Sequence, residues 1–311
     1  MTALRTATAA NMGLDRVSVY QRVMDYVILT KPRMVVMILA VTVAGFYIGT
    51  TGTPDWVGLL NLLLGVSLAS GGTLALNQYL ERNEDAQMER TQFRPLPDGR
   101  IRPLPALCFG VVLTVGGLSY LTLMVHPLAG LVTTVTTCTY LFWYTPLKLK
   151  SSLCSVVGAI PGALPPVTGW VAARGRFDVF DVEVWVLFGI LFLWQIPHAL
   201  AIAWLYRDDF ARAGFRLLPV LHPDGKSTGR QIVIHSIALQ AVALMPTLIG
   251  LAGPIYFVTA LILGLVFLGF SVDAALSRTN EAARRLMFAS LVYLPLVYLL
   301  MALDKAPGIF G

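Results

Sequence analysis

Charged residues are scarce in this sequence. Asp, Glu, Lys and Arg make up 13% of its 311 residues, whereas hydrophobic residues make up 56%; an ordinary soluble domain has about a quarter charged residues. So little charge argues against a soluble protein and is typical of a polytopic membrane protein. The net charge of +6 does not indicate nucleic-acid binding, because the basic residues lie in short connections between apolar segments.

Cysteine is also rare, with Cys108, Cys138 and Cys154 the only three in the sequence. They lie in or beside apolar segments and lack C-x-x-C or histidine-paired spacing, so we expect neither disulfides nor a cysteine metal site. The first 30 residues mix acidic with basic side chains and lack an apolar core followed by a small-residue cleavage site. This pattern argues against a secretory signal peptide.

Long apolar runs are abundant. A helix that crosses a bilayer needs about 20 predominantly apolar residues. We expect an all-α polytopic membrane protein with nine transmembrane helices in residues 33–303, a cytoplasmic segment at 1–32 and a short non-cytoplasmic tail at 304–311. The nine predicted spans are 33–50, 56–79, 104–125, 127–147, 154–173, 183–205, 231–252, 255–277 and 283–303.

Lys and Arg lie almost entirely on one predicted side of the membrane. That side holds all but three of the 23 basic residues, the exceptions being Arg174, Arg176 and Lys305. By the positive-inside rule the N-terminus is cytoplasmic and the C-terminus is not. The two long polar connections, 81–103 and 207–230, then face the cytoplasm, where we expect the active site.

The predicted fifth span carries three glycines and three prolines within 158–170. Inside lipid, such residues allow either close contact between helices or a broken helix of the kind that transporters use. Both interpretations stay open at this point.

Oxygen-bearing side chains recur at four-residue intervals where the second span ends. Asn77, Glu81 and Asp85 share one face of a continuing helix, about 6 Å apart per step. Such a row suits Mg²⁺, which prefers one or two carboxylates together with water and phosphate oxygens. Arg90 and Arg94 follow, and guanidinium groups suit phosphate. The alternative is a solvated helix end with acid–base pairs.

A second acidic cluster closes the sixth span. Asp208 and Asp209 are followed by two arginines, as in the first cluster. Two facing acidic clusters would hold two metal ions across a diphosphate, whose charge repels bare carboxylates. His198 lies two to three turns earlier; an intramembrane histidine indicates a functional site, although a structural hydrogen bond to a neighbouring helix is the alternative.

The first of these segments resembles the signature of the intramembrane aromatic prenyltransferases. The pattern N-x-x-x-E-x-x-x-D-x-x-M-x-R-T-x-x-R-P-L runs from Asn77 to Leu96. Four further segments resemble the branch of that family whose acceptor is haem. In order they are YTPLKLKS (144–151), GAIPGALPPVTGW (158–170), WQIPHALAIAW (194–204) and YRDDFARAGFRLLPV (206–220). Together these matches extend across most of the chain.

The resemblance implies a helical bundle around a central cavity, with Mg²⁺ as cofactor. It also implies transfer of the farnesyl group of farnesyl diphosphate to a vinyl group of haem b, with addition of water, to give haem O. Asn77, Glu81 and Asp85 would form one metal site, and Asp208 and Asp209 the other. Adjacent aspartates replace the family's spaced D-x-x-x-D, so which of the two binds metal stays open.

Further roles follow from the same resemblance. Lys148, Arg90 and Arg94 would bind the diphosphate, although a membrane anchor is the alternative for Lys148. The predicted catalytic residues are Asp85, Asp209 and His198, the histidine as haem ligand or general acid–base group.

The partners expected are farnesyl diphosphate, haem b and the lipid bilayer, and a downstream haem-modifying enzyme is left open. The expected location is a bacterial cytoplasmic membrane, with the protein crossing it several times. Two other functions are weighed: prenyl transfer to another aromatic acceptor, such as a quinone or chlorophyll precursor, and transport of haem or lipid. A transporter more typically places charges at mid-membrane, whereas here they gather at one face.

Overall fold

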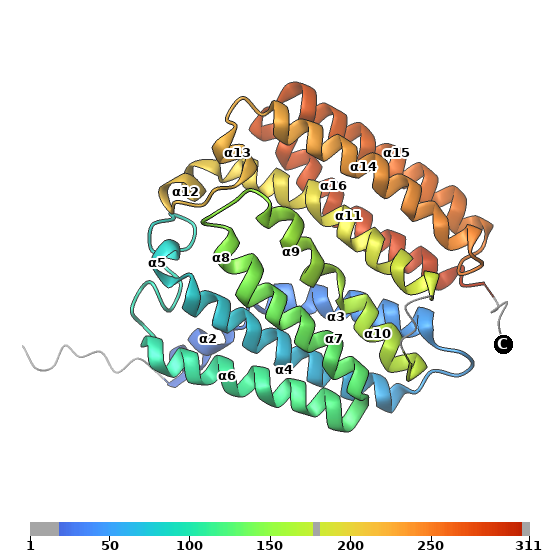
Figure 1. Cartoon of the computed structure of the whole chain (residues 1–311), viewed down its shortest axis with the longest axis horizontal. Helices are drawn as coiled ribbons and strands as arrows, with labels where there is room; N and C mark the ends of the chain where they lie inside the picture. Colours follow the sequence, from blue (N-terminus) through green and yellow to red (C-terminus); the bar gives the residue numbers. More distant parts are fainter. Residues whose placement is uncertain (1–18, 177–180, 307–311) are drawn as a thin grey trace, which may run out of the picture.

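The computed structural model describes residues 19–176 and 181–306, which are almost entirely helical (Figure 1). Within these ranges no strand forms, and one isolated β-bridge joins Ala252 to Lys305. The elements are α2 (Val19–Leu29), α3 (Pro32–Gly49), α4 (Trp56–Leu80), α5 (Arg82–Asp85), α6 (Pro103–Tyr120), η1 (Leu121–Val125), α7 (Pro127–Cys138), η2 (Thr139–Tyr144), α8 (Thr145–Leu147), α9 (Cys154–Ala163), α10 (Pro165–Arg174), α11 (Val182–Leu205), α12 (Arg207–Arg212), α13 (Leu218–Leu221), α14 (Lys226–Leu248), α15 (Pro254–Ser277) and α16 (Asn280–Leu303).

Among the described residues, eight helical segments are long and apolar enough to cross a membrane, and they match eight of the nine predicted spans. The ninth, 127–147, is helical as α7, η2 and α8, but five of the seven residues 133–139 are threonine. These hydroxyls lower its hydropathy, and Thr133 Oγ1 donates to the carbonyl of Ala129 one turn earlier at 2.8 Å. The number of nine crossings and the orientation of the N-terminus stay predictions.

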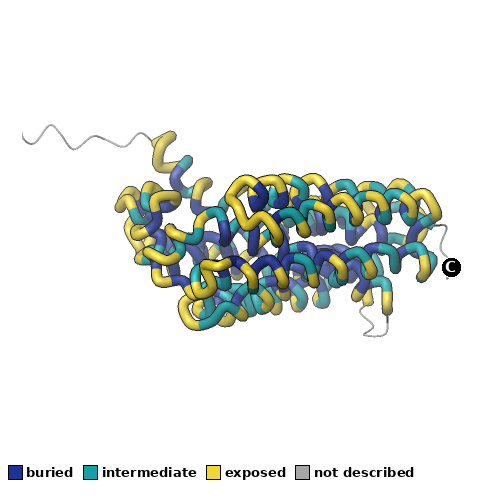
Figure 2. Tube along the Cα trace, turned by 90° about the horizontal axis from the view of Figure 1, so that it is seen from above, coloured by how far each residue is buried: buried dark blue, intermediate teal, exposed yellow. Residues whose placement is uncertain are grey.

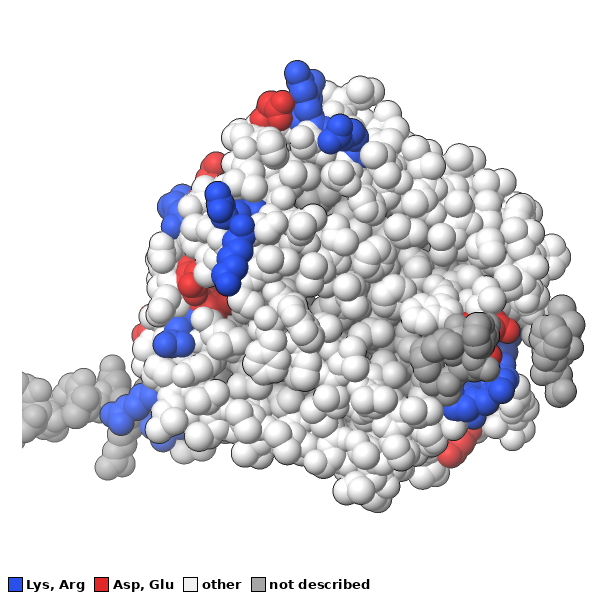
Figure 3. Space-filling model, in the orientation of Figure 1, with Lys and Arg blue, Asp and Glu red and all other residues white. Residues whose placement is uncertain are grey.

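The long helices run side by side, and the short helices gather at one end. The elements α5, α12 and α13 lie together there (Figure 1, left), and we call this the α5 end. The opposite end is where α3, α10 and α16 finish. Buried residues line the inward faces of the helices, while exposed residues follow the outer faces (Figure 2). On the face shown in Figure 3, charged side chains gather at the two ends and the surface between them is uncharged.

The predicted fifth span is broken at Leu164, between α9 and α10. Pro165 begins α10, and proline cannot donate the backbone hydrogen bond that would continue a helix. The same span packs closely on α3: a Cβ atom on Gly169 would lie 2.1 Å from the carbonyl oxygen of Thr42. Both interpretations of this span therefore apply, because Pro165 breaks the helix and Gly169 permits close contact between helices.

The N-terminal helix α2 packs against the α5 end. Leu29 is fully buried, and its carbonyl accepts a hydrogen bond from Gln78 Nε2 at 2.9 Å. Asp25 forms an ion pair with Arg100, which ties α2 to the connection after α5. Residues 19–31, expected as part of a separate cytoplasmic segment, thus pack against the bundle, and Lys31 enters the site described next. The predicted divisions at 32/33 and 303/304 stay predictions.

Candidate active site

Asn77, Glu81 and Asp85 form the continuous row that their spacing predicts. The Glu81 amide donates to the Asn77 carbonyl at 2.9 Å, and the Asp85 amide donates to the Glu81 carbonyl at 2.8 Å. The helical hydrogen-bond pattern therefore continues from α4 through Glu81 into α5. All three side chains are buried, so the row faces the interior of the α5 end and not solvent.

Each member of this row is paired with a basic side chain from elsewhere in the chain. Asn77 Oδ1 accepts from Lys31 Nζ at 3.0 Å, and Glu81 Oε1 accepts from Lys148 Nζ at 2.5 Å. Both oxygens of Asp85 accept from Arg94 Nη1, at 2.9 and 2.7 Å. The alternative interpretation of a solvated helix end with local acid–base pairs does not describe this cluster, because its three acceptors are buried and two of the three cations lie far away in sequence.

Lys148 is enclosed by aromatic rings as well as by its carboxylate. Its Nζ lies 4.5 Å from the centre of the Tyr144 ring and 5.8 Å from that of Phe215. Burial alone would lower the pKa of Lys148, but Tyr144 and Glu81 outweigh it and raise this pKa above its usual value. Lys148 therefore stays charged at neutral pH and is directed into the cluster, which favours an anion ligand over a membrane anchor.

The two adjacent aspartates differ sharply in environment. Asp209 is buried, and its two oxygens accept from the backbone amides of Glu89 and Arg90 at 3.2 and 3.3 Å. It also forms an ion pair with Arg212. The side chain of Asp208, by contrast, is 86% exposed, and its nearest cation is Arg207 at 4.0 Å. Of the two candidates for the second metal site, only Asp209 belongs to the cluster.

The connections after α4 and α11 pack on each other and so bring the two acidic clusters together. Met88 is buried against Ala213 and Phe215. Thr91 Oγ1 donates to the Asp85 carbonyl at 2.8 Å, which fixes the turn that follows α5. The Arg216 amide donates to the Lys148 carbonyl at 2.8 Å. Met88 and Thr91, singled out by the resemblance, therefore hold the site together in this structure.

Arg90 lies over the aromatic rings of α12 and the residue before it. Its guanidinium carbon is 5.1 Å from the centre of the Tyr206 ring and 5.9 Å from that of Phe210. Burial and the nearby charge of Arg94 lower the pKa of Arg90. With no carboxylate bonded to its side chain among the described residues, Arg90 is a cation that an anionic ligand would stabilise.

Lys31 belongs to the cluster but was not predicted from the sequence as a site residue. It adopts a left-handed backbone conformation (φ 49°), which is unusual for a residue other than glycine. Burial and the charges of Arg94 and Lys148 lower its pKa to about 7. The sequence offered one signal, a lysine directly before the proline that starts the first span, and that pattern is equally typical of a membrane anchor.

The residues present fit a Mg²⁺–diphosphate site. Among the described residues, no three Asp, Glu, His or Cys side chains gather closely enough to hold a metal by themselves. Magnesium does not need such a cage, because it usually takes one or two carboxylates and completes its shell with water and phosphate oxygens. Glu81, Asp85 and Asp209 supply carboxylates of this kind, and each is neutralised here by a cation suited to phosphate.

His198 lies apart from the charged cluster. It precedes Asp208 by ten residues, about 15 Å along a helix axis. Its Nδ1 lies 2.6 Å from Ser290 Oγ, and its ring stacks on Trp194 at 4.9 Å between ring centres. Because Ser290 Oγ already donates to the Met287 carbonyl at 2.6 Å, it accepts from His198 Nδ1. The lone pair then remains on Nε2.

Residues 38–292 match the model of the UbiA prenyltransferase family. The protoheme IX farnesyltransferase of Solibacter usitatus (strain Ellin6076) is 47% identical over 294 residues, which are 92% of this chain and 99% of that protein. The protein of the same name from Koribacter versatilis (strain Ellin345) is 42% identical and covers 94% of this chain and 97% of its own length.

Solved structures agree in fold. That of digeranylgeranylglyceryl phosphate synthase has a TM-score of 0.76 at 16% identity and covers 91% of this chain and 98% of its own. A UbiA homologue from Archaeoglobus fulgidus, bound to GPP and Mg²⁺, has a TM-score of 0.59 at 17% identity and covers 89% of this chain and 99% of its own. At these identities the structures establish the fold alone.

Proposed function

Because the chain belongs to the UbiA prenyltransferase family, we propose that it transfers the farnesyl group of farnesyl diphosphate to a vinyl group of haem b, with addition of water, to give haem O. The name of the Solibacter and Koribacter relatives, which align along nearly their whole length, supports haem as acceptor. One observation in the structure supports farnesyl diphosphate as the prenyl donor. The buried row Asn77, Glu81 and Asp85 is paired with three basic side chains, those of Lys31, Lys148 and Arg94.

We infer that these pairs exchange partners when substrate binds. Lys148 and Arg94 would turn to the diphosphate oxygens, which releases Glu81 and Asp85 for the metal. Arg90 would contact the diphosphate from the α12 side. Lys31 is added to the proposed diphosphate-binding residues because it contacts Asn77. A ligand that brings both the metal and the phosphate charge keeps every buried charge compensated, and an unpaired buried charge is costly.

Asn77, Glu81 and Asp85 are the proposed ligands of one Mg²⁺, and Asp209 is the proposed ligand of a second. Asp208 is set aside because its side chain is exposed. The bound metal would neutralise the diphosphate and make it a better leaving group, as the Mg²⁺ and GPP bound by the Archaeoglobus homologue suggest.

Aromatic side chains beside the cluster would stabilise the farnesyl cation that forms as diphosphate leaves. Tyr144 and Tyr206 contact the cations Lys148 and Arg90 with their ring faces. When these two side chains turn to the diphosphate, the same faces would become available to a carbocation. Tyr79 and Trp194, which lie on α4 and α11, contact Arg82 and His198 instead. The haem vinyl group would attack this cation, and water would add to the resulting carbon, so that haem b, farnesyl diphosphate and water give haem O and diphosphate.

His198 is proposed to serve the haem side of the reaction. Its Nδ1 proton is held by Ser290, so Nε2 presents a lone pair that suits a haem iron or a proton from the attacking water. We propose that the protein is a multi-pass protein of a bacterial cytoplasmic membrane, with the α5 end on the cytoplasmic side, where the basic residues concentrate.

The test is a reaction of the purified protein with haem b, farnesyl diphosphate and Mg²⁺, followed by mass analysis of the pigment. We expect haem to gain one farnesyl group and one hydroxyl group, and to gain nothing when the metal is chelated. Unmodified haem, together with prenylation of an aromatic quinone precursor in a parallel reaction, would show that haem is the wrong acceptor.

A further inference from the structure

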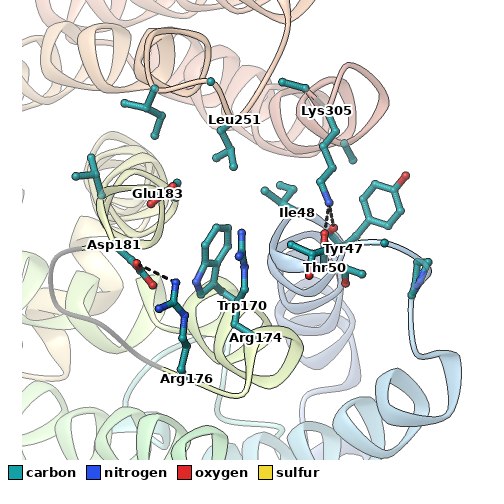
Figure 4. A pocket seen from close by; sticks show the side chains of 18 of the residues that line it. Tyr47, Ile48, Thr50, Trp170, Arg174, Arg176, Asp181, Glu183, Leu251 and Lys305 are labelled. Carbon is teal, nitrogen blue, oxygen red and sulfur yellow. Dashed lines mark hydrogen bonds and ion pairs between the residues drawn. The ribbon is translucent and has the colours of Figure 1, made fainter. Parts of the chain in front are cut away.

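A cavity of about 880 Å³ opens at the end of the bundle opposite the α5 end. Figure 4 shows it between the last turns of α3, α10 and α16 and the first turn of α11, with Trp170, Arg174 and Lys305 among its lining residues. Its volume falls in the range of ligand pockets, about 300 to 1,000 Å³. The 24 residues of α11 separate the two ends by about 36 Å, so this cavity is distinct from the proposed active site.

The basic residues of this cavity are the exceptions to the charge bias of the whole chain. All 23 Lys and Arg residues but Arg174, Arg176 and Lys305 lie on the predicted cytoplasmic side, and these three line the cavity. Orientation in the membrane does not account for them, because the positive-inside rule disfavours basic residues on this side. Their convergence from two distant parts of the sequence indicates a binding role.

Two hydrogen-bond donors in the cavity lack acceptors within the described part of the chain. Trp170 is 1% exposed, and its indole Nε1 is buried with no hydrogen-bond partner among the described residues; the same holds for Arg174 Nε. The Arg174 guanidinium carbon lies 4.9 Å from the centre of the Trp170 ring, so both donors belong to one corner of the cavity. A buried donor without an acceptor is costly, and a ligand with acceptor oxygens would satisfy both.

The described residues of the cavity carry more positive than negative charge. Arg176 lies 3.9 Å from Asp181, but Lys305 Nζ donates to two carbonyl oxygens, those of Tyr47 and Thr50, at 2.8 and 2.6 Å. Burial and the charge of Arg174 lower the pKa of Lys305. Glu183 is the second carboxylate among the described lining residues, so within residues 19–176 and 181–306 three cations face two carboxylates. A ligand with a negative charge would complete the balance.

We propose that this cavity binds the acidic headgroup of an anionic membrane phospholipid, with its phosphate accepting hydrogen bonds from Arg174 and Trp170. Apolar side chains at the rim fit the rest of such a molecule, since Val182 and Leu303 line the cavity and are 51% and 75% exposed. Acyl chains leaving the headgroup would lie along these side chains. Basic pockets between transmembrane helices on the cytoplasmic side bind acidic lipid headgroups, and the same electrostatic attraction would act in this cavity.

The experiment is native mass spectrometry of the purified full-length protein, mixed in detergent with phosphatidylglycerol or phosphatidylcholine. We expect wild type to retain one phosphatidylglycerol at least about tenfold more strongly than phosphatidylcholine, because the choline cation of phosphatidylcholine is repelled by the basic residues of the cavity. Arg174→Gln, which removes a positive charge, should lose this preference. Trp170→Phe, which keeps an aromatic ring and removes a donor to the phosphate, should lower the retention of both lipids. The control is Arg285→Gln, which removes an arginine paired with Asp273 outside the cavity and should keep it.

Equal retention of the two lipids by wild type would overturn the proposal, as would equal effects of the Arg174 and Arg285 substitutions. A thermal-unfolding series guards against misfolded variants: phosphatidylglycerol should raise the melting temperature of wild type and of Arg285→Gln, and should not raise that of Trp170→Phe. The same rise in all three proteins would refute the site. Neither measurement uses farnesyl diphosphate or haem, so its outcome is independent of the proposed transferase activity.

Discussion

Replacing Lys148 by methionine should destabilise the protein strongly, because Glu81 would remain buried without its cation. Lys148 Nζ and Glu81 Oε1 are 2.5 Å apart, and the two side chains are 13% and 10% exposed. Removing one partner of a buried ion pair costs about 3 to 5 kcal/mol. Since this pair keeps some exposure, we expect a loss of about 3 kcal/mol in the free energy of unfolding.

The double variant Glu81→Gln/Lys148→Met should recover most of that stability and come within about 1 kcal/mol of wild type, because no buried charge is then left unpaired. The assay is unfolding in detergent micelles by added dodecyl sulfate, followed by tryptophan fluorescence, without ligand and with chelator. If Lys148→Met costs less than about 1 kcal/mol, or if the double variant loses the sum of the two single losses, the pair is not coupled as described. The double variant should also be inactive, since it lacks both a metal ligand and a phosphate ligand.

Three further predictions concern other parts of the molecule. Asp209→Asn should lower kcat/KM for farnesyl transfer by about 100-fold, about 2.7 kcal/mol of barrier, whereas Asp208→Asn should leave it nearly unchanged; equal effects would contradict the assignment. Gly169→Ala should lower the melting temperature through overpacking of about 1 to 3 kcal/mol, whereas Gly269→Ala, whose added Cβ meets nothing within 4 Å, should not. The pKa of Lys31 is about 7 in the folded state and about 10.4 in the unfolded state, so the unfolded chain binds more protons between these two pH values. The free energy of unfolding should therefore rise with pH from about 7 to about 10.4, and Lys31→Met should remove this rise.

The helical architecture was largely predictable, because apolar runs about 20 residues long have few alternatives to a membrane helix. The row of Asn77, Glu81 and Asp85 was also predictable, since helical periodicity places residues four apart on one face. The structure confirms that the three side chains lie together. Their role as metal ligands stays a prediction.

Other features depend on contacts that the sequence does not encode locally. Asp208 and Asp209 are neighbours in sequence, and the packing of the connection after α4 on α12 decides that Asp209 is buried and Asp208 exposed. Lys31 reaches Asn77 across 46 residues, so no local pattern identified it. His198 was predicted to be catalytic, and the structure adds Ser290 as the group that fixes its ring.

The most direct test of the central claim is to measure metal binding by electron paramagnetic resonance, with Mn²⁺ as a substitute for Mg²⁺. Binding is measured with and without a farnesyl diphosphate analogue in which sulfur replaces the oxygen that joins the farnesyl group to the diphosphate. If the carboxylates at the α5 end exchange their cations for metal when diphosphate binds, wild type should take up about two Mn²⁺ per chain with the analogue and far less without it. Asp85→Asn should lose this uptake, and Asp208→Asn should keep it. Uptake by Asp85→Asn equal to wild type, or uptake by wild type that ignores the analogue, would contradict the proposed site.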